Sequence, residues 1–458
     1  MKVSLLTKWF AVFIQTIVAF TCNSHTEGDL SEEQWIEKAI SIIIEDNDIP
    51  AISVGIVKNS ELQLLVSRGY LSRDSSSEVN GNTNFQIGSL TKTFTGILAK
   101  VFIAEGRLKL TDSISTYLPH SLSPSARAKL RPITVGDIVF HQSGLPRDSI
   151  IAHRFGNEPM LCCYDEQDLL NDLEILELMY KPGLKAEYSN LGYSVLGYIM
   201  QRLSGKEFES LLNQYIFKPF EMKNSTTELT DIQQKQAAIP YRKENRKYKT
   251  RPFEMGFLKP SGGVFSNVND LSKLMILQMN AARQEIKQAD SNHLWSTEFT
   301  RSFSKKWEYG FGAFKSDSGR IMHGGDLDGF ASAYSYYPEQ DFGLIILTSS
   351  GGRWLWQLEN LLLQKLMGQK VSLPEFTQSI TISKDKLAAY TGRIDIDGKI
   401  INIVQRQNSL EAFFSDSLVP YELTFLSSSK AYSKTYGFVF HYTFDENGVP
   451  LDIRFEAP

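Results

Sequence analysis

The sequence of 458 residues has little cysteine: it contains only Cys22 and the adjacent pair Cys162 and Cys163. Neighbouring cysteines are poorly placed to bridge each other, so no disulfide framework is expected. The seven histidines show no ligand spacing such as H-E-x-x-H. These absences disfavour a disulfide-stabilised scaffold and a metal-dependent hydrolase, and no metal or cofactor is expected.

A strong charge of one sign is also missing. The formal net charge is -4, and no long basic run with interleaved aromatic residues occurs, so the composition does not favour nucleic acid as a partner. Hydrophobic residues make up 42% and charged residues 22% of the chain, which is typical of globular proteins. The length fits two or three domains, or one large domain with an appendage.

No apolar run is long enough to span a bilayer comfortably. The run Trp9–Phe20, preceded by Lys2 and Lys8, has the length of a signal-peptide core. It predicts an exported protein in the periplasm or on the outer surface of a bacterial cell, with residues 1–22 as the signal peptide. Cys22 follows at once, which resembles a lipoprotein cleavage site whose lipidated cysteine would tether the protein to a membrane. Ordinary cleavage nearby is the other interpretation.

Periodic patterns predict a large first domain over residues 31–368. Apolar residues recur at helical spacing after Ser31, and Gln34 three residues on would complete a helix cap. Strand patterns lie at both ends of this region, and the residues between them are mostly helical in pattern. The predicted class is α+β, with an antiparallel sheet flanked by helices and an inserted, mostly helical region. The expected strands are 51–57, 62–66, 310–314, 331–337 and 343–348.

The pattern changes after a break near Gly368–Pro374. Short alternating segments follow, at 400–404, 410–414, 438–443 and 451–455. They predict a small, barrel-like antiparallel β domain over residues 375–458. Its role (oligomerisation, substrate gating or simple packing) and the oligomeric state are left open by the sequence.

The first motif that could carry chemistry is a Ser-x-x-Lys spacing at Ser89 and Lys92. Apolar spacing over 90–105 predicts a helix that begins at Ser89, with Lys92 one turn on and on the same face. The helix N-terminus would stabilise negative charge at the serine, and a lysine in a partly dry site can act as a base. A helix cap with a solvated lysine is the other interpretation, since the spacing recurs at Ser302–Lys305, Ser383–Lys386 and Ser427–Lys430. The copy at Ser89 differs in its position, after a turn and a glycine and at the start of a long helix with an apolar face.

Two later motifs carry further polar groups. Tyr188 and Asn190 form the only Tyr-x-Asn of the chain, where the phenol could relay protons and the amide could hold a lysine or a substrate amide. His323 and Gly325 form a His-x-Gly motif before Asp326, where the glycines let a ligand approach the backbone and the histidine could orient substrate. Taken singly, these residues also fit a loop tyrosine, a helix cap and a surface turn.

In this order, the three motifs closely resemble those of the serine β-lactamase family. That family includes class C β-lactamases, D-alanyl-D-alanine carboxypeptidases and related esterases and D-amino-acid peptidases. Two further stretches match: His141–Pro146 resembles its His-x-Ser-Gly-Leu-Pro segment, and Ser261–Gly263 resembles its Gly-Gly loop. The resemblance covers roughly residues 33–367 and implies a β-lactamase/transpeptidase-like fold.

The resemblance also implies a role for each residue. Ser89 would attack a carbonyl and form an acyl-enzyme, while Lys92 and Tyr188 share the general-base and general-acid work. Asn190 would hold substrate and the lysine. The backbone N–H groups of Ser89 and Asp326 would form the oxyanion hole, next to Gly325 and His323, and such donors are each worth about 3 kcal/mol of barrier.

One departure from the family bears on the substrate. Many β-lactamases have Lys-Thr-Gly at the third motif, where the lysine helps to recognise a substrate carboxylate. Here His323 is neutral or partly charged near pH 7, and Gly324 lacks a hydroxyl. The resemblance therefore implies a serine hydrolase acting on a small ester or on an amide or peptide bond, such as a D-amino-acid or cell-wall peptide. A D-alanyl-D-alanine carboxypeptidase or a β-lactamase is the alternative within the enzymes, and a non-catalytic peptidoglycan-binding relative is the alternative outside them.

Overall fold

The computed structural model describes residues 30–151, 164–242, 247, 249–252, 254–287, 301–327, 329–396, 399–414, 420–433, 437–446 and 450–456. The predicted signal peptide with Cys22, and the pair Cys162 and Cys163, lie outside the described residues. Among the helices that are described, none is both long and apolar enough to cross a membrane.

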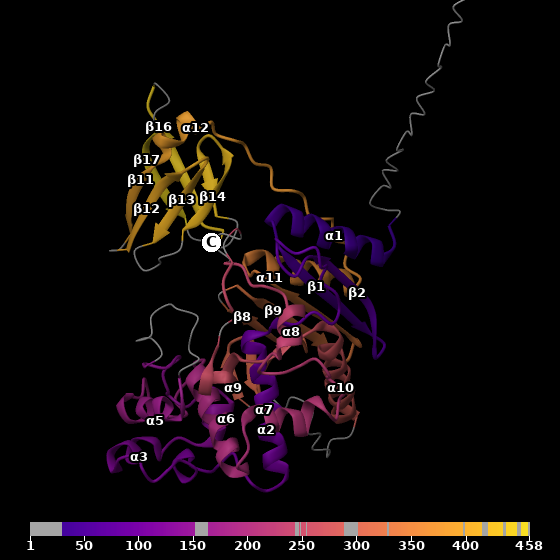
Figure 1. Ribbon diagram of the computed structural model, residues 1–458, viewed down its shortest axis with the longest axis vertical. Coiled ribbons are helices and arrows are strands. Elements are labelled where there is room, and N and C mark those ends of the chain that lie inside the picture. Colours follow the sequence, from indigo (N-terminus) through magenta and orange to yellow (C-terminus); the bar gives the residue numbers. More distant parts are fainter. Residues whose placement is uncertain are drawn as a thin grey trace, which may run out of the picture.

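An antiparallel sheet of eight strands forms the centre of the first domain, in the order β2-β1-β10-β9-β8-β7-β6-β5 (Figure 1). Because β1 pairs with β10, with Ile52 opposite Thr348, the two ends of the domain meet inside one sheet. The strands are β1 (Ala51–Lys58), β2 (Glu61–Gly69), β5 (Arg301–Ser304), β6 (Trp307–Gly310), β7 (Ala313–Ser316), β8 (Ile321–Asp326), β9 (Ala331–Tyr337) and β10 (Phe342–Thr348).

Helices cover both faces of this sheet, because alternate residues of the central strands point to opposite sides. Leu344 and Ile346 pack with α1 (Glu32–Asn47) and α11 (Arg353–Leu366) on one face. Ile345 and Leu347 belong to the larger core on the other face, which includes α2 (Thr91–Ala104), α6 (Asn190–Ser204) and α10 (Val268–Lys287). The predicted cap of α1 is present, with Ser31 and Gln34 bonded to each other's backbone N–H.

The mostly helical region between β2 and β5 carries the remaining short elements. They are β3 (Phe85–Gln86), η2 (Gly88–Leu90), η3 (Ile114–Thr116), α3 (Pro124–Leu130), α4 (Val135–Val139), α5 (Glu166–Ile175), α7 (Phe208–Leu212), η5 (Asn213–Phe217), α8 (Asp231–Gln236), η6 (Gly256–Leu258), α9 (Lys259–Gly262) and β4 (Phe265–Ser266). The predicted α+β class with a helical insertion is therefore confirmed.

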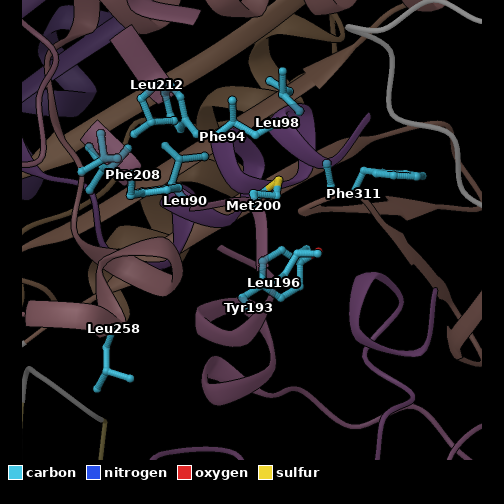
Figure 2. Packing of buried hydrophobic residues seen from close by; sticks show 14 of the residues in the cluster. Leu90, Phe94, Leu98, Tyr193, Leu196, Met200, Phe208, Leu212, Leu258 and Phe311 are labelled. Carbon is cyan, nitrogen blue, oxygen red and sulfur yellow. The ribbon is translucent and has the colours of Figure 1, made fainter. Parts of the chain in front are cut away.

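The helix that carries the Ser-x-x-Lys motif starts later than predicted. Ser89 lies in the 3₁₀ turn η2, and the α-helix α2 begins two residues later at Thr91. Gly88 has a φ of 56°, so the chain turns sharply just before Ser89. Leu90, Phe94 and Leu98 then anchor α2 in the core beside Tyr193 and Leu196 of α6 (Figure 2).

The predicted single strand over 310–314 is wrong, because β6 and β7 are separated by a tight turn. Phe311 and Gly312 both have positive φ, at 48° and 83°, so the chain reverses there. A Cβ on Gly312 would lie 2.0 Å from the Lys92 carbonyl oxygen, and Thr93 Oγ1 donates to the Gly312 carbonyl at 2.7 Å. The turn thus packs on α2 at Lys92, the lysine of the Ser-x-x-Lys motif.

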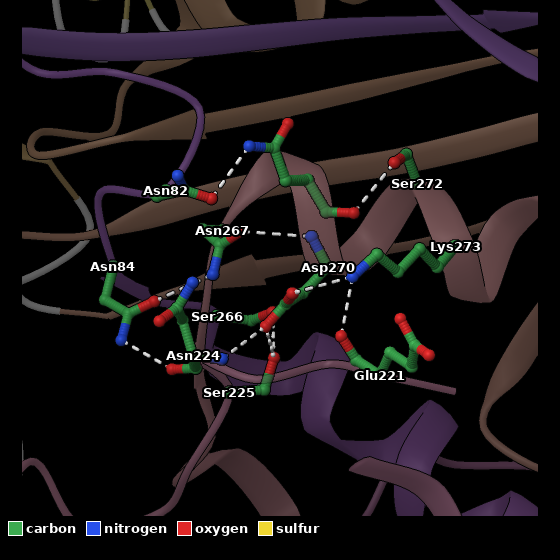
Figure 3. Close-up of polar contacts among 11 residues, drawn as sticks. Asn82, Asn84, Glu221, Asn224, Ser225, Ser266, Asn267, Asp270, Ser272 and Lys273 are labelled. Atoms are coloured by element: carbon green, nitrogen blue, oxygen red, sulfur yellow. Dashed lines mark hydrogen bonds and ion pairs between the residues drawn. The ribbon is translucent and has the colours of Figure 1, made fainter. Parts of the chain in front are cut away.

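A buried polar cluster ties the segment before Ser89 to the start of α10 (Figure 3). Asn267 donates to Asn84 Oδ1 at 3.1 Å, and Asn84 donates to the Asn224 carbonyl at 2.7 Å. Asp270 at the start of α10 accepts from the Asn224 N–H and from the Ser225 hydroxyl, both at 2.9 Å. Because Asn84 directly precedes β3 and Asn267 directly follows β4, the cluster fixes the two-stranded ribbon that leads into η2.

The second domain, yellow in Figure 1, is a meander of seven antiparallel strands in chain order. A Cβ on Gly392 would lie 2.8 Å from Ile453, so the first and last strands touch and the sheet is nearly a barrel, as predicted. Its own core includes Leu410 and Phe440. Its elements are α12 (Lys384–Leu387), η7 (Ala388–Tyr390), β11 (Gly392–Ile396), β12 (Lys399–Arg406), β13 (Ser409–Phe414), β14 (Tyr421–Ser427), β15 (Lys430–Tyr432), β16 (Val439–Phe444) and β17 (Pro450–Glu456).

Candidate active site

Ser89 sits where three parts of the first domain meet. Its turn η2 follows β3 and precedes α2, and the Ile87 N–H donates to the Val264 carbonyl at 2.9 Å. Ser332 Oγ in β9 donates to the Ile87 carbonyl at 2.8 Å. The residue before the turn is thus tied to the Gly-Gly loop and to the sheet, while Ser89 itself stays partly exposed. A fixed and accessible hydroxyl is what a nucleophile requires.

Lys92 is fully buried one turn along from Ser89. Its Nζ lies 2.6 Å from the Ser261 carbonyl oxygen, 2.7 Å from Asn190 Oδ1 and 3.2 Å from Ser89 Oγ. Burial lowers the pKa of Lys92 well below its ordinary value; the Asp148 carboxylate opposes this shift. The lysine is therefore held beside the serine under conditions that favour its neutral form.

Asn190, the first residue of α6, connects Lys92 to a carboxylate. Its Nδ2 donates to Asp148 Oδ1 at 2.6 Å, which fixes the amide so that Oδ1 faces Lys92. The Asn190 N–H also donates to the Arg147 carbonyl at 2.6 Å. Asp148 and Arg147 were not predicted as site residues, and their only signal in the sequence was their position directly after the His-x-Ser-Gly-Leu-Pro segment.

The ring of Tyr188 lies close to two basic side chains. Lys92 Nζ is 4.8 Å and the Arg147 guanidinium carbon 5.3 Å from the ring centroid. Burial raises the pKa of the Tyr188 hydroxyl well above its ordinary value, and the neighbouring Ser89 hydroxyl opposes this shift. Tyr188 is therefore protonated at neutral pH, and its buried hydroxyl makes no regular hydrogen bond with the described residues.

His141 holds the segment that carries Tyr188. Its Nδ1 accepts from the Ser189 N–H at 3.2 Å, its carbonyl accepts from the Glu187 N–H at 2.7 Å, and its ring lies 4.4 Å from the Tyr188 ring. Since Nδ1 accepts, the proton of the neutral ring is on Nε2. Burial, followed by the charge of Lys92, lowers the pKa of His141 well below its ordinary value. The resemblance pointed to this segment but not to the positioning role.

His323 in β8 is buried and neutral. Burial, together with the charge of Lys92, lowers its pKa to about 3. Its Nδ1 lies 2.7 Å from the Gly324 carbonyl oxygen, which can only accept, so Nδ1 carries the proton and Nε2 keeps a lone pair. His323 therefore offers a hydrogen-bond acceptor and no positive charge, with its ring 6.2 Å from that of Tyr188.

Gly325 and Asp326 bring the end of β8 against the turn that carries Ser89. A Cβ on Gly325 would lie only 1.9 Å from the Ile87 carbonyl oxygen, so no side chain fits there. The Asp326 nitrogen lies 3.3 Å from the position of a Cβ on Gly88, one residue before Ser89. The backbone of Asp326 is thus beside the turn of Ser89, as a predicted oxyanion-hole donor would have to be.

The other three Ser-x-x-Lys spacings lack these surroundings. Ser302 lies in β5, Ser383 precedes α12 and Ser427 ends β14, and each has an exposed or half-exposed lysine after it. The structure therefore brings together Ser89, Lys92, Tyr188, Asn190, His323, Gly325 and Asp326. Within the described ranges, no group of three or more His, Cys, Asp or Glu side chains could hold a metal ion.

The family model named Beta-lactamase matches residues 36–364, which is most of the chain. The chain belongs to the beta-lactamase family. This confirms the resemblance inferred from the three motifs, and membership of the family supports hydrolase activity of the serine type.

Individual relatives are distant. The chain is 26% identical over 340 residues to Protein flp of Staphylococcus aureus strain MW2, covering 74% of this chain and 67% of the relative. It is 25% identical over 253 residues to a beta-lactamase of Pseudomonas fluorescens, covering 55% and 66%.

Two solved structures share the fold. The octameric penicillin-binding protein homologue from Pyrococcus abyssi aligns with a TM-score of 0.62 and 21% identity, over 92% of this chain and 98% of its own. The D-alanine carboxypeptidase AmpC from Burkholderia cenocepacia aligns with a TM-score of 0.59 and 18% identity, over 73% and 99%. At these identities the likeness concerns architecture, and the first alignment is long enough to take in part of the β domain as well.

Proposed function

We propose that this beta-lactamase family member hydrolyses an ester or an amide bond through an acyl-enzyme on Ser89. One observation carries the proposal. A neutral lysine has two hydrogens and one lone pair, and both hydrogens of Lys92 are taken by groups that accept, the Ser261 carbonyl and Asn190 Oδ1. The lone pair is then directed at the Ser89 hydroxyl, 3.2 Å away.

In the first step, Ser89 Oγ bonds to the carbonyl carbon while its proton passes to Lys92 Nζ. The carbonyl electrons move to the oxygen, which the backbone N–H groups of Ser89 and Asp326 stabilise. As the leaving group departs it takes a proton from the Tyr188 hydroxyl, which Lys92 reprotonates. Water then attacks the acyl-enzyme by the same route in reverse and releases the acid and Ser89. The lowered pKa of Lys92 supports its role as the base, and Tyr188 is protonated at neutral pH, as a proton donor must be.

The third motif supports ester and peptide substrates over efficient β-lactam hydrolysis. His323 supplies no cation for a substrate carboxylate, since its pKa of about 3 leaves it neutral at physiological pH. A D-alanyl-D-alanine carboxypeptidase or a β-lactamase remains the alternative activity. A peptidoglycan-binding protein without turnover would have no use for a buried lysine aimed at a serine.

Release of p-nitrophenol from a short-chain ester by residues 27–458 tests the proposal. Ser89→Ala should abolish turnover, and intact-mass measurement should detect the acyl group on the unmodified protein alone. Ser302→Ala is a matched control, because it removes an exposed serine with the same spacing to a lysine. Equal turnover in the Ser89→Ala variant would rule out this nucleophile. No turnover of esters, D-amino-acid peptides or β-lactams would favour the binding protein.

We also propose that the protein is exported, with residues 1–22 as the signal and Cys22 as the site of a lipid anchor. The basis is the apolar run before Cys22. Fractionation of bacterial cells tests both parts. Export predicts that the protein leaves the cytoplasm, and anchoring predicts that Cys22→Ala moves it from the membrane to the soluble fraction. A membrane fraction unchanged by Cys22→Ala would refute the lipid anchor.

A further inference from the structure

The side chain of Arg147 is a cation at the rim of the candidate site. Its guanidinium carbon lies 5.3 Å from the Tyr188 ring centroid, and the side chain is 67% exposed. The position of the residue is fixed, because its carbonyl accepts from the N–H groups of Asn190 and Leu191, at 2.6 and 3.2 Å. A solvent-facing charge is thus held over the tyrosine proposed to protonate the leaving group.

The guanidinium donors of Arg147 are largely unused. Its approach to Asp148 is 3.6 Å, between Nε and Oδ2, which is longer than a hydrogen bond. Asp148 Oδ1 is already occupied by the amide of Asn190 at 2.6 Å. With respect to the described residues, the Arg147 side chain makes no hydrogen bond. It is therefore available to a ligand, and arginine binds carboxylates through two parallel hydrogen bonds.

The other basic groups of the site cannot take this role. The Lys92 amine is fully buried and bonded to protein acceptors, and the free nitrogen of His323 is an acceptor that would repel an anion. The charge of Arg147 acts on the site nonetheless, since it lowers the pKa of Tyr188, Lys92 and His141.

We infer that Arg147 recognises an anionic group, of the carboxylate class, on the substrate of this enzyme. The inference rests on the proposed function, which it narrows to esters or amides that carry a carboxylate near the scissile bond. The carboxylate would lie outside the Tyr188 ring, bound by the guanidinium, while the carbonyl is at Ser89. Asp148 would keep Asn190 in place and leave the outer donors of Arg147 to the substrate.

The test compares matched neutral and anionic esters. The acyl-side pair is 4-nitrophenyl butyrate and mono-4-nitrophenyl glutarate, and the leaving-group pair is phenyl acetate and 3-acetoxybenzoate. We expect Arg147→Gln to lower kcat/KM about tenfold for the anionic member of at least one pair, which is the scale of a charge-assisted hydrogen bond. Because the charge of Arg147 also acts on Lys92 and Tyr188, the neutral members can change as well, so the readout is the anionic-to-neutral ratio of kcat/KM within each pair. Arg147→Lys should retain part of the preference.

Arg454→Gln is the matched control, since Arg454 is 78% exposed and approaches Asp452 through Nε at the same 3.6 Å. Unchanged anionic-to-neutral ratios in Arg147→Gln for both pairs would overturn the inference and leave the proposed function standing. A loss for neutral and anionic esters alike would also overturn it, because Arg147 would then act only through Tyr188. Failure of the unmodified protein to turn over, or to be acylated by, any neutral or anionic ester, D-amino-acid peptide or β-lactam would overturn the proposed function, and this inference with it.

Discussion

Replacing Gly325 by alanine should separate the two parts of the oxyanion hole. The added Cβ would lie 1.9 Å from the Ile87 carbonyl oxygen and 2.8 Å from Ser332 Oγ, whereas real Cβ contacts below 3.0 Å are essentially never seen. Ile87 is held by both Val264 and Ser332, so the strain cannot be relieved by a side chain alone. The end of β8 and the turn of Ser89 would have to move apart by about 1 Å, and a misplacement of that size costs about 100-fold in rate.

The assay is kcat/KM for a p-nitrophenyl ester together with a thermal melt. We expect Gly325→Ala to lose about 100-fold in kcat/KM and about 1–3 kcal/mol of stability. Gly324→Ala is the control, because its Cβ would meet Ser332 and the tip of Trp356 at 3.0 and 3.1 Å. Trp356 is 46% exposed and can shift, so the loss should be much smaller. Equal activities of the two variants would refute the reasoning that the close approach at Gly325 builds the site.

Three further predictions follow from buried polar groups. Because the base must be unprotonated, kcat/KM should rise with pH through the lowered pKa of Lys92. The pH–rate profile of His323→Gln should show the same rise, since His323 is already neutral. His141→Phe keeps a ring but removes the acceptor of the Ser189 N–H, so urea unfolding should show a loss of about 1–3 kcal/mol. Asp172→Ala should lose about 3 kcal/mol or more, because this buried carboxylate accepts from two backbone N–H groups and two hydroxyls.

A specific result would contradict each of these three predictions. Loss of the pH limb in His323→Gln would assign the titration to the histidine instead of Lys92. His141→Asn offers an oxygen in place of Nδ1 and tolerates the φ of 55°, so it should be more stable than His141→Phe. The reverse order would mean that the ring, not the hydrogen bond, matters. An unchanged unfolding midpoint in Asp172→Ala would show that its hydrogen bonds are dispensable.

The residues of the candidate site could be singled out in the sequence because side chains with distinctive chemistry recur there at distinctive spacings. Ser89 and Lys92 are three residues apart, so a helical turn alone brings them together. Tyr188 and His323 lie far away in sequence, and only the family resemblance placed them at one site. The class and the two-domain pattern could likewise be predicted from periodicity, since strands and helices bury residues at different intervals.

The features that could not be predicted depend mostly on backbone groups, backbone conformation and tertiary contacts. The Ser261 carbonyl that accepts from Lys92 has no sequence signature, because every residue has a carbonyl group. The turn at Phe311 and Gly312 was missed because a bulky residue there takes a positive φ, which local propensity disfavours. Asp148 was missed because a charged residue after a loop motif is ordinarily solvated, and its bond to Asn190 depends on tertiary structure.

The pairing of β1 with β10 has a consequence for how the protein is made. The strand at 51–58 is synthesised early, but its partner at 342–348 emerges nearly three hundred residues later. Ser89 is likewise made long before Gly325 and Ser332, which brace its turn. A nascent chain therefore holds Ser89 without the sheet that organises its turn, and a ribosome stalled before β8 yields a chain whose candidate site is incomplete. The site can be complete only once the late strands of the domain have been added.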